Sequence, residues 1–170
     1  MGMTLTEKIL ARKSGHHTVL PGEIVEVTVD RLMVNDFVGP NVCTLFAKYG
    51  ENKVMSPDRI LFSIDHSAPP SAVDSANRIM QLRNFCKEQG IKRFCDMGQH
   101  GISHQLMVEN FCMPGEIAVG TDSHATLYGG LGTFGCGITA SDAVVAMSCG
   151  KIWLKIPQTI RINLPADSGI

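Results

Sequence analysis

Apolar and polar residues follow one another along the chain in patterns that predict short strands separated by helices. Residues 23–29 alternate, with three valines on one face, and predict a strand. Pro40 favours the start of a helix that extends to about Lys48. Residues 59–64 (RILFSI) predict a buried strand, and residues 71–90 carry apolar side chains at helical spacing and end at a glycine suited to a C-terminal cap.

The remaining segments continue this order of strands and helices. Residues 4–7 (TLTE) match the capping box at the start of a helix, which we expect to end near residues 14–15. The other predicted elements are strands over residues 93–95 and 117–119, helices over residues 103–110 and 139–150, a glycine-rich loop over residues 120–137, and one or two strands within residues 152–164. This alternation predicts an α/β fold in which helices cover both faces of a mostly parallel sheet. Ligands bind such sheets at the carboxyl ends of their strands.

The chain has 170 residues, 44% of them apolar, which is enough for one domain with a core of its own. Fifteen Lys plus Arg and 16 Asp plus Glu leave a formal net charge of −1, which argues against nucleic acid bound through a basic surface. No apolar run approaches the roughly 20 residues of a membrane helix. The first ten residues also lack the pattern of a signal peptide. We therefore expect a cytoplasmic protein with no membrane partner.

Six cysteines occur in the chain, and none forms a C-x-x-C pair: Cys43, Cys86, Cys95, Cys112, Cys136 and Cys149. An even number leaves a disulfide framework open. However, a chain of this size and hydrophobicity does not need disulfides, and the cysteines lie mostly within apolar segments. We expect them to be reduced, buried side chains.

Four of the six histidines follow the ends of predicted strands: His66, His100, His104 and His124. Asp65 directly precedes His66, and Asp122 lies two residues before His124, so each pair places a carboxylate close to an imidazole. A carboxylate that accepts one ring N–H fixes the tautomer and raises the basicity of the other nitrogen, as proton transfer or metal binding requires. A single pair also fits a loop cap, but three such loops at successive strand ends favour a functional site.

Two other kinds of site are compatible with parts of this pattern. A zinc hydrolase would use His66, His104 and His124, although the sequence contains no H-E-x-x-H motif. Ser123 lies between Asp122 and His124, but a catalytic triad needs residues that converge in space, and a G-x-S-x-G motif is absent from the sequence. We expect Ser123 to bind an anionic oxygen through its hydroxyl and backbone N–H.

Residues 130–135 (GLGTFG) match the G-x-G-x-x-G pattern of dinucleotide-binding proteins. That fold requires a strand directly before the glycines and an acidic residue about 20 positions after them. A polar loop precedes them here, Asp142 comes too early and Asp167 too late. We therefore interpret the glycines as residues that let a loop pack closely under the turn that carries His124.

Three motifs of the chain resemble those of the aconitase superfamily, in compatible order and spacing. Residues 120–124 (GTDSH), followed by residues 129–132 (GGLG), resemble its GTDSHT…GGLG signature. Residues 65–66 (DH), with Pro69 after them, resemble its DH motif, and residues 96–105 (DMGQHGISHQ) resemble its GxGIxHQ segment. Three ordered motifs make this a specific resemblance.

The resemblance covers about residues 4–164, and the start of the chain looks most like the large subunits of 3-isopropylmalate dehydratase and homoaconitase. It implies an aconitase-type N-terminal α/β domain over residues 1–164, followed by an atypical tail at residues 165–170. The complete enzyme would be a [4Fe–4S] hydro-lyase, as in leucine biosynthesis, whose iron acts as a Lewis acid on a malate-type 2-hydroxy acid such as 3-isopropylmalate or homocitrate. Its partners would be a small, swivelling-domain subunit and the rest of the large subunit.

The resemblance also implies roles for individual residues. His66 would protonate the leaving hydroxyl, oriented by Asp65. His104 would pair with Asp122 near the reacting oxygens, and His124 would face the substrate or water. The residue between these last two, Ser123, would bind a substrate carboxylate.

The chain departs from the family pattern in several respects. The family's cluster cysteines, which include a C-x-x-C, would lie downstream, so this chain alone is expected to ligate no cluster. The acidic partner of His124, the substrate-binding arginines and the serine base would also lie beyond residue 170 or on the small subunit. Ala125 replaces the usual Thr, and His100 replaces the usual Gly, so we do not expect His100 to be catalytic.

Two hypotheses from different classes follow. In the first, the chain is a piece of an enzyme, well under half of a usual large subunit, and is inactive until the missing segment, a cluster and a small subunit are supplied. In the second, it is a cluster-free module that binds a carboxylate or another protein. A truncated piece should also expose the surface meant for the missing part, so we expect an apolar patch and self-association.

Overall fold

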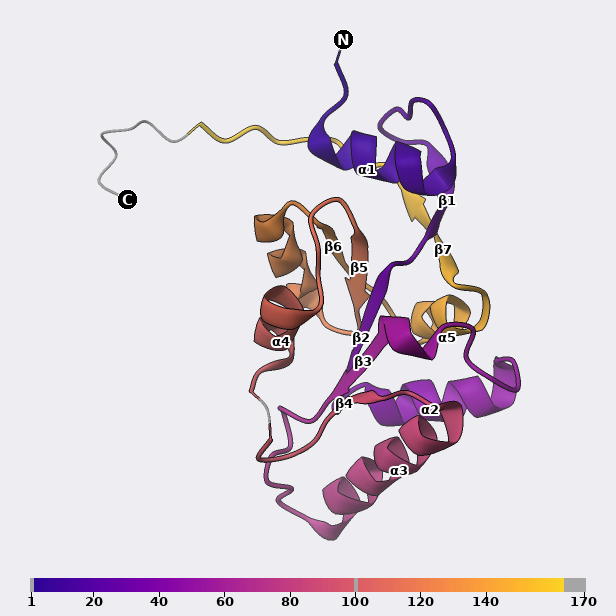
Figure 1. The fold of residues 1–170 in the computed structure, drawn as a ribbon, viewed down its shortest axis with the longest axis vertical. Helices are drawn as coiled ribbons and strands as arrows, with labels where there is room; N and C mark the ends of the chain where they lie inside the picture. Colours follow the sequence, from indigo (N-terminus) through magenta and orange to yellow (C-terminus); the bar gives the residue numbers. More distant parts are fainter. Residues whose placement is uncertain (1, 100, 164–170) are drawn as a thin grey trace.

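Five parallel strands form the central sheet, in the spatial order β4-β3-β2-β5-β6 (Figure 1). The computed structural model describes residues 2–99 and 101–163. The strands of this sheet are β2 (Arg31–Asn35), β3 (Ile60–Ser63), β4 (Arg93–Cys95), β5 (Ile117–Gly120) and β6 (Phe134–Gly137). The parallel sheet confirms the α/β class that the alternation of elements predicts.

Helices cover both faces of this sheet, as predicted: α2, α3 and α5 lie on one face, and α4 and η2 on the other (Figure 1). Met33 of β2 packs with Met107 of α4 and Tyr128 of η2, whereas the next residue, Val34, belongs to the core on the opposite face. Among the described residues, none of the helices combines the length and hydrophobicity that a bilayer span requires. The helices are α1 (Leu5–Ser14), α2 (Gly39–Tyr49), α3 (Val73–Gln89), α4 (Ser103–Asn110) and α5 (Ala140–Cys149), with 3-10 helices η1 (Pro57–Arg59) and η2 (Ser123–Leu131).

A second layer lies at the amino-terminal end of the sheet. Strand β1 (Ile24–Thr28) pairs in antiparallel fashion with β7 (Lys151–Lys155), and α1 packs against β1. Lys13 of α1 lies 2.6 Å from the carboxylate of Asp30, which also accepts a hydrogen bond from the backbone N–H of Ile117 at 2.8 Å. Because these contacts lie just before β2 and at the first residue of β5, α1 lies at the opposite end of these strands from their carboxyl ends.

The order of the strands reverses between β2 and β5. From β2 the chain moves outward through β3 to β4, and it then returns to the other side of β2 as β5 and β6. Connections that leave neighbouring strands in opposite directions open a crevice at the carboxyl ends of those strands, where ligands bind in folds of this kind. The loops after Asn35 and Gly120 therefore lie at this crevice.

Most predicted elements are confirmed, with closely matching boundaries. The capping box of α1 is formed, since the Thr4 hydroxyl accepts a hydrogen bond from the N–H of Glu7 and the Glu7 carboxylate accepts one from the N–H of Thr4. The sequence-based prediction was wrong for β2, which it omitted, and for β6, which lies in the segment expected to be a loop. After β7, Ile156 is still buried in the core, and the described residues 157–163 form no further strand and leave the body of the molecule (Figure 1). His100 and the tail at residues 165–170 lie outside the described residues.

Glycines allow β6 to pass close under the turn that begins η2. A Cβ atom at Gly135 would overlap the backbone oxygen of Ala125, and one at Gly137 would lie 2.8 Å from the backbone oxygen of Asp122. No larger side chain fits at either position unless backbone atoms shift. Of the glycines in residues 130–135, Gly135 thus fits the interpretation of close packing under the turn that carries His124, although the packing segment is a strand and not a loop. A Cβ atom at Gly130 or Gly132 would meet nothing closer than 3.9 Å.

We expect Gly135→Ala to destabilise the chain, because its new methyl group meets backbone atoms that cannot rotate away. Overpacking of this kind costs about 2–3 kcal/mol in the free energy of unfolding. Gly129→Ala is the matched control, since a Cβ atom at Gly129 meets nothing within 4 Å, and its effect should stay within about 0.5 kcal/mol. Chemical denaturation of both variants checks the difference, and equal stabilities would contradict the packing described here.

Candidate active site

The polar residues predicted from the motifs gather at the carboxyl ends of the strands. Asp65 and His66 follow β3, His104 lies in the first turn of α4, and the segment that carries His124 follows β5. In each of two groups, one potential ligand atom per residue lies within 4.8 Å of the others. The groups are Asp36, Asp65 and His66, and His104, Asp122 and His124.

Asp65 links the loop after β3 to the start of α4. One of its oxygens, Oδ1, lies 2.7 Å from Nδ1 of His66. The other, Oδ2, accepts hydrogen bonds from the backbone N–H of Ser103 at 2.7 Å and from the Ser103 hydroxyl at 2.5 Å. The Ser103 hydroxyl also contacts that of Ser63 at the end of β3. Because His104 is the next residue along α4, the carboxylate that holds the ring of His66 also fixes the backbone next to His104.

Hydrogen bonds and charge set the protonation states of this first group. Burial raises the pKa of Asp65, but hydrogen bonds from Ser103 and His66 outweigh it, so the pKa of Asp65 lies below its ordinary 3.8. Burial lowers the pKa of His66, but the hydrogen bond and charge of Asp65 and the charges of Asp36 and Asp122 outweigh it, so the pKa of His66 lies above 6.5. An imidazole that protonates this readily, next to an ionised carboxylate, suits a general acid.

In the second group, one oxygen of Asp122 collects three N–H donors. Its Oδ1 lies 3.0 Å from Nε2 of His104 and 2.9 Å from Nδ1 of His124, and it accepts the backbone N–H of His124 at 2.8 Å. Burial raises the pKa of Asp122, but these hydrogen bonds outweigh it and the pKa lies below 3.8. The predicted pairing of His104 with Asp122 is therefore present. The same carboxylate also holds His124, whose acidic partner was expected to lie beyond residue 170.

Asp122 and Tyr128 together determine which nitrogen of His104 carries the proton. The Tyr128 hydroxyl lies 3.1 Å from Nδ1 of His104. Mainly because the side chain is buried, the pKa of Tyr128 is raised, and the phenol keeps its proton. An ionised Asp122 can only accept, so Nε2 of His104 must carry a hydrogen and donate it. In the neutral imidazole, Nδ1 then accepts the phenol proton. Both nitrogens of His104 are thus engaged within this chain.

The other two imidazoles each keep one nitrogen available. Because His66 and His124 donate Nδ1–H to carboxylates, Nε2 of each ring has no hydrogen-bond partner among the described residues. The side chain of His66 is 41% exposed and that of His124 is 81% exposed. His124 also lines a hollow of about 490 Å³ together with Ile102 and Leu127. These two Nε2 atoms can exchange protons with a bound molecule.

Ser123, the remaining residue predicted for the site, takes no part in these contacts. Ser123 is the first residue of η2 and is exposed, so its hydroxyl is accessible.

The zinc interpretation lacks a single ligand set, because His66 is separate from the group of His104 and His124 within the described chain. The six thiols are free; five of them lie in or against the apolar clusters, whereas Cys149 is exposed, contrary to the expectation of buried cysteines. Burial raises the pKa of Cys43 and Cys112 to about 12. No group of three or more potential metal ligands among the described residues contains a cysteine.

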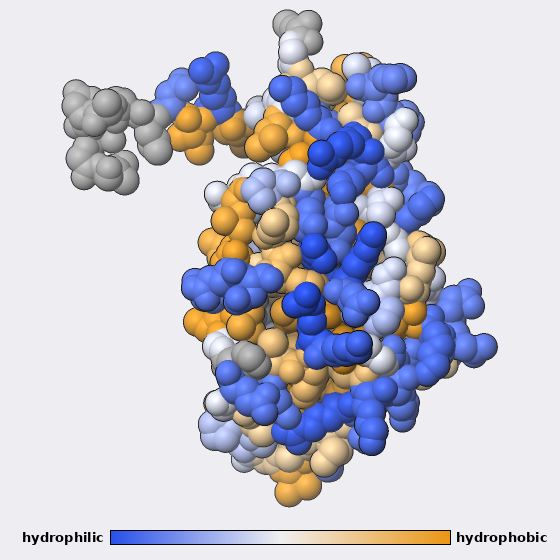
Figure 2. Space-filling view, in the orientation of Figure 1, coloured by the Kyte–Doolittle hydropathy of each residue, from blue (hydrophilic) through white to orange (hydrophobic). Residues whose placement is uncertain are grey.

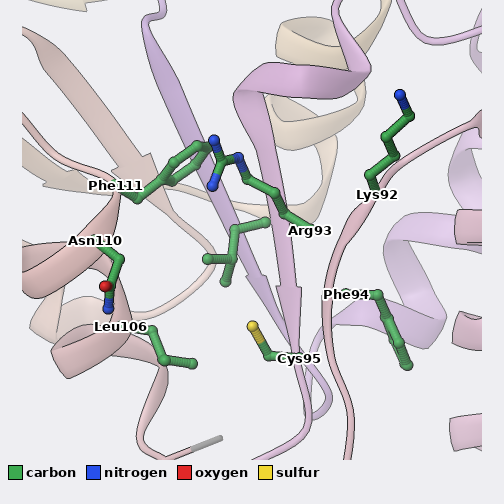
Figure 3. Close-up of a pocket in the computed structure, with 8 residues that line it drawn as sticks. Lys92, Arg93, Phe94, Cys95, Leu106, Asn110 and Phe111 are labelled. Carbon is green, nitrogen blue, oxygen red and sulfur yellow. The ribbon is translucent and has the colours of Figure 1, made fainter.

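A second hollow, of about 290 Å³, lies between β4 and α4 (Figure 3). Arg93 lies over the ring of Phe111, with Cζ 4.6 Å from the ring centroid, while Cys95 and Leu106 line the lower part (Figure 3). The lining contains none of the carboxylates and imidazoles described above. This hollow is therefore separate from the candidate site.

Sequence reasoning missed three residues of the site. Asp36 is buried and belongs to the first group, but it follows β2, a strand that was not predicted. Ser103 lies inside a motif quoted for the family resemblance, yet its contact with Asp65 joins segments 38 residues apart. Tyr128 is fully buried, and nothing in the glycine-rich sequence around it indicated a contact with a histidine. Only the position of Asp36 after a strand could have indicated its role.

These features define a class of protein: a doubly wound α/β domain that holds carboxylate-supported imidazoles at its switch point. The family model for "Aconitase family (aconitate hydratase)" matches residues 7–168 of the chain. The chain belongs to the aconitase family. Its motifs and its fold thus lead to the same family as the whole-chain comparison.

Within that family, the chain is similar to large subunits of 3-isopropylmalate dehydratase. It is 40% identical over 165 residues to the "Probable 3-isopropylmalate dehydratase large subunit" of Methanothermobacter thermautotrophicus, which covers 96% of this chain and 39% of the relative. It is 41% identical over 167 residues to the "3-isopropylmalate dehydratase large subunit 1" of Pyrococcus furiosus, which covers 98% of this chain and 39% of that relative. The chain therefore spans about two fifths of the length of these relatives.

We expect Tyr128→Phe to change the electronic environment of His104 without unfolding the chain. The variant removes one buried hydrogen bond, which should lower the free energy of unfolding by about 1 kcal/mol. The ¹⁵N chemical shift of Nδ1 of His104 should move, because this nitrogen loses its donor, while Nε2 stays protonated against Asp122.

Two-bond ¹H–¹⁵N NMR correlation measures both ring nitrogens. Tyr49→Phe is the control, since Tyr49 is 68% exposed and lies on α2. If a folded Tyr128→Phe variant leaves the Nδ1 shift of His104 unchanged, the tautomer assigned above is wrong.

Proposed function

We propose that this chain is the N-terminal part of the large subunit of an iron–sulfur hydro-lyase that dehydrates a malate-type 2-hydroxy acid, with 3-isopropylmalate as its substrate. Family membership and the names of the relatives support the reaction class and this substrate. The names given above lend no support to homocitrate. The observation that carries the proposal is the pair of imidazoles, His66 and His124, whose Nδ1 atoms are held by carboxylates while Nε2 remains accessible.

Dehydration of a hydroxy acid breaks a carbon–oxygen bond and a neighbouring carbon–hydrogen bond. The leaving hydroxyl needs a proton, and the proton from carbon would pass to the serine base, which the family resemblance implies lies outside this chain. His66 is suited to supply the proton for the leaving hydroxyl from Nε2, because Asp65 accepts its Nδ1–H and because the pKa of His66 lies above 6.5. In the reverse direction the same nitrogen takes the proton back. Nε2 of His124 would contact the substrate or water, and the exposed hydroxyl of Ser123 would donate to a substrate carboxylate.

His104 has a supporting role in this proposal. Its two ring nitrogens are engaged by Asp122 and Tyr128, so it has no free atom for the substrate in this arrangement. It holds Asp122 in place, and Asp122 in turn orients His124. The five residues predicted to be catalytic thus divide into proton-exchanging rings and the groups that orient them.

The site needs groups from outside this chain. A dicarboxylate substrate requires cationic partners, but no Lys or Arg side chain donates to the carboxylates of either group within the described residues. The cysteines do not fit a [4Fe–4S] cluster, because they form no ligand set together. We therefore assign the cluster ligands to the remaining length of the large subunit, and the missing cations to that segment and a small subunit.

We expect the chain alone to lack dehydratase activity and to gain it when its three missing parts are supplied. These are the remaining large-subunit segment as a second polypeptide, a small subunit, and a cluster reconstituted under anaerobic conditions. In that mixture His66→Gln should lower kcat by roughly 10²- to 10⁴-fold, since it removes the general acid. His17→Gln, in an exposed turn, is the matched control and should leave kcat unchanged.

Intact mass, iron and acid-labile sulfide of the chain alone complete this experiment. A chain that carries stoichiometric iron and sulfide by itself would contradict the assignment of cluster ligands. Full activity of the His66→Gln variant would contradict the role of His66. A complete mixture that binds the hydroxy acid but never turns it over would favour the carboxylate-binding module.

Apolar side chains beside the candidate site are exposed. Figure 2 shows hydrophobic surface gathered over α4 and η2, and Ile102 and Leu127 there are 65% and 54% exposed. We propose that the missing parts cover this surface and that the isolated chain self-associates through it. Sedimentation should show a mass that rises with concentration, and Ile102→Ser should weaken the association. Ile24→Ser, at the other end of the molecule, is the control, and a monomer at all concentrations would contradict the idea.

A further inference from the structure

Asp36 is a buried carboxylate that accepts hydrogen bonds from three consecutive backbone N–H groups. It follows β2, the central strand, and is only 5% exposed. Its Oδ1 accepts the N–H of His66 at 3.0 Å and that of Asp65 at 3.3 Å, and its Oδ2 accepts the N–H of Ser67 at 2.7 Å. The loop that carries His66 is thus fastened to the strand beside it by one side chain.

The same carboxylate also faces the ring of His66. Nδ1 of His66 lies 3.4 Å from Oδ1 of Asp36, in addition to 2.7 Å from Oδ1 of Asp65. The next residue, Phe37, stacks on the imidazole with a centroid separation of 6.0 Å and an interplanar angle of 28°. Asp36 and Phe37 therefore hold both the backbone and the ring of His66.

We propose that Asp36 is a positioning residue for His66. It fixes the loop at residues 65–67 through the backbone, and its negative charge favours the protonated ring that the acid step requires. The catalytic part of this inference rests on the proposed function. The fastening of the loop and the effect on the ring do not, because both are properties of the chain without substrate.

Three carboxylates act on the titration of His66. Asp36 comes from the end of β2, Asp65 from the end of β3 and Asp122 from the end of β5, and each raises the pKa of His66 against the effect of burial. Asp65 also accepts a hydrogen bond from Ser103. Asp122 accepts hydrogen bonds from the ring of His104 and from the backbone N–H of His124. Asp36 is the member of this set that also holds the backbone of His66.

The test is a pH titration of the His66 ring by NMR in the full chain and in Asp36→Asn. The variant keeps the shape but removes the charge, so the acid dissociation constant of His66 should rise about three- to tenfold. Asp30→Asn is the matched control: Asp30 lies just before the same strand, also accepts a backbone N–H and also has a charged neighbour, Lys13. It should change stability but leave the titration of His66 unchanged.

A folded Asp36→Asn variant in which His66 titrates as in the parent chain would overturn the proposal. If this variant does not fold, hydrogen exchange of the parent chain decides. The amide protons of His66 and Ser67 should then exchange slowly although they follow the end of β3, and fast exchange would refute the fastening. None of these measurements requires dehydratase activity, so failure of the reconstituted enzyme leaves this result standing, and the reverse also holds.

Discussion

The carboxylate of Asp65 joins two segments that reach the site from different strands. One oxygen accepts the ring N–H of His66, and the other accepts the backbone N–H and hydroxyl of Ser103, the first residue of α4. His104 follows directly in that helix, so the side chain that holds the ring of His66 also fixes the start of the helix that carries His104. The contact of Ser103 with Ser63 closes the link inside the protein, where it is shielded from water.

The carboxylates of the site present little bare negative charge, although it contains three of them. Asp36 is surrounded by backbone N–H groups, Asp65 by a ring and a helix start, and Asp122 by two rings and an N–H. Both oxygens of Asp36 and of Asp65, and Oδ1 of Asp122, thus accept hydrogen bonds within the described residues. What remains accessible is mainly the Nε2 edge of two imidazoles. An anionic ligand can therefore approach Nε2 of His66 without meeting a carboxylate oxygen that lacks a hydrogen-bond donor.

Local signals account for the parts of this structure that the sequence predicts. The capping box of α1, the helical spacing of α3 and the two Asp–His pairs all act within a few residues. Strand β2 was not predicted because its three apolar residues, 32–34, are buried on both faces of the sheet. They therefore show no alternation of apolar and polar residues, and the apolar run is too short to indicate a strand. Its omission also hid Asp36. Strand β6 was not predicted because its glycines have low strand propensity, and its conformation depends on pairing with β5. The contact of Tyr128 with His104 depends on tertiary packing that no local pattern encodes.

The pairing of β1 with β7 has a consequence for synthesis of the chain. Val27 lies opposite Ile152, 125 residues later, and β1 has no other strand partner in the described sheets. A ribosome adds about 5–20 residues per second, so the valine face of β1 leaves the ribosome roughly 6–25 s before its partner exists. Helix α1 is made before β1 and packs against it in the finished fold. It is therefore the element available to shield the nascent strand from neighbouring chains until translation reaches β7.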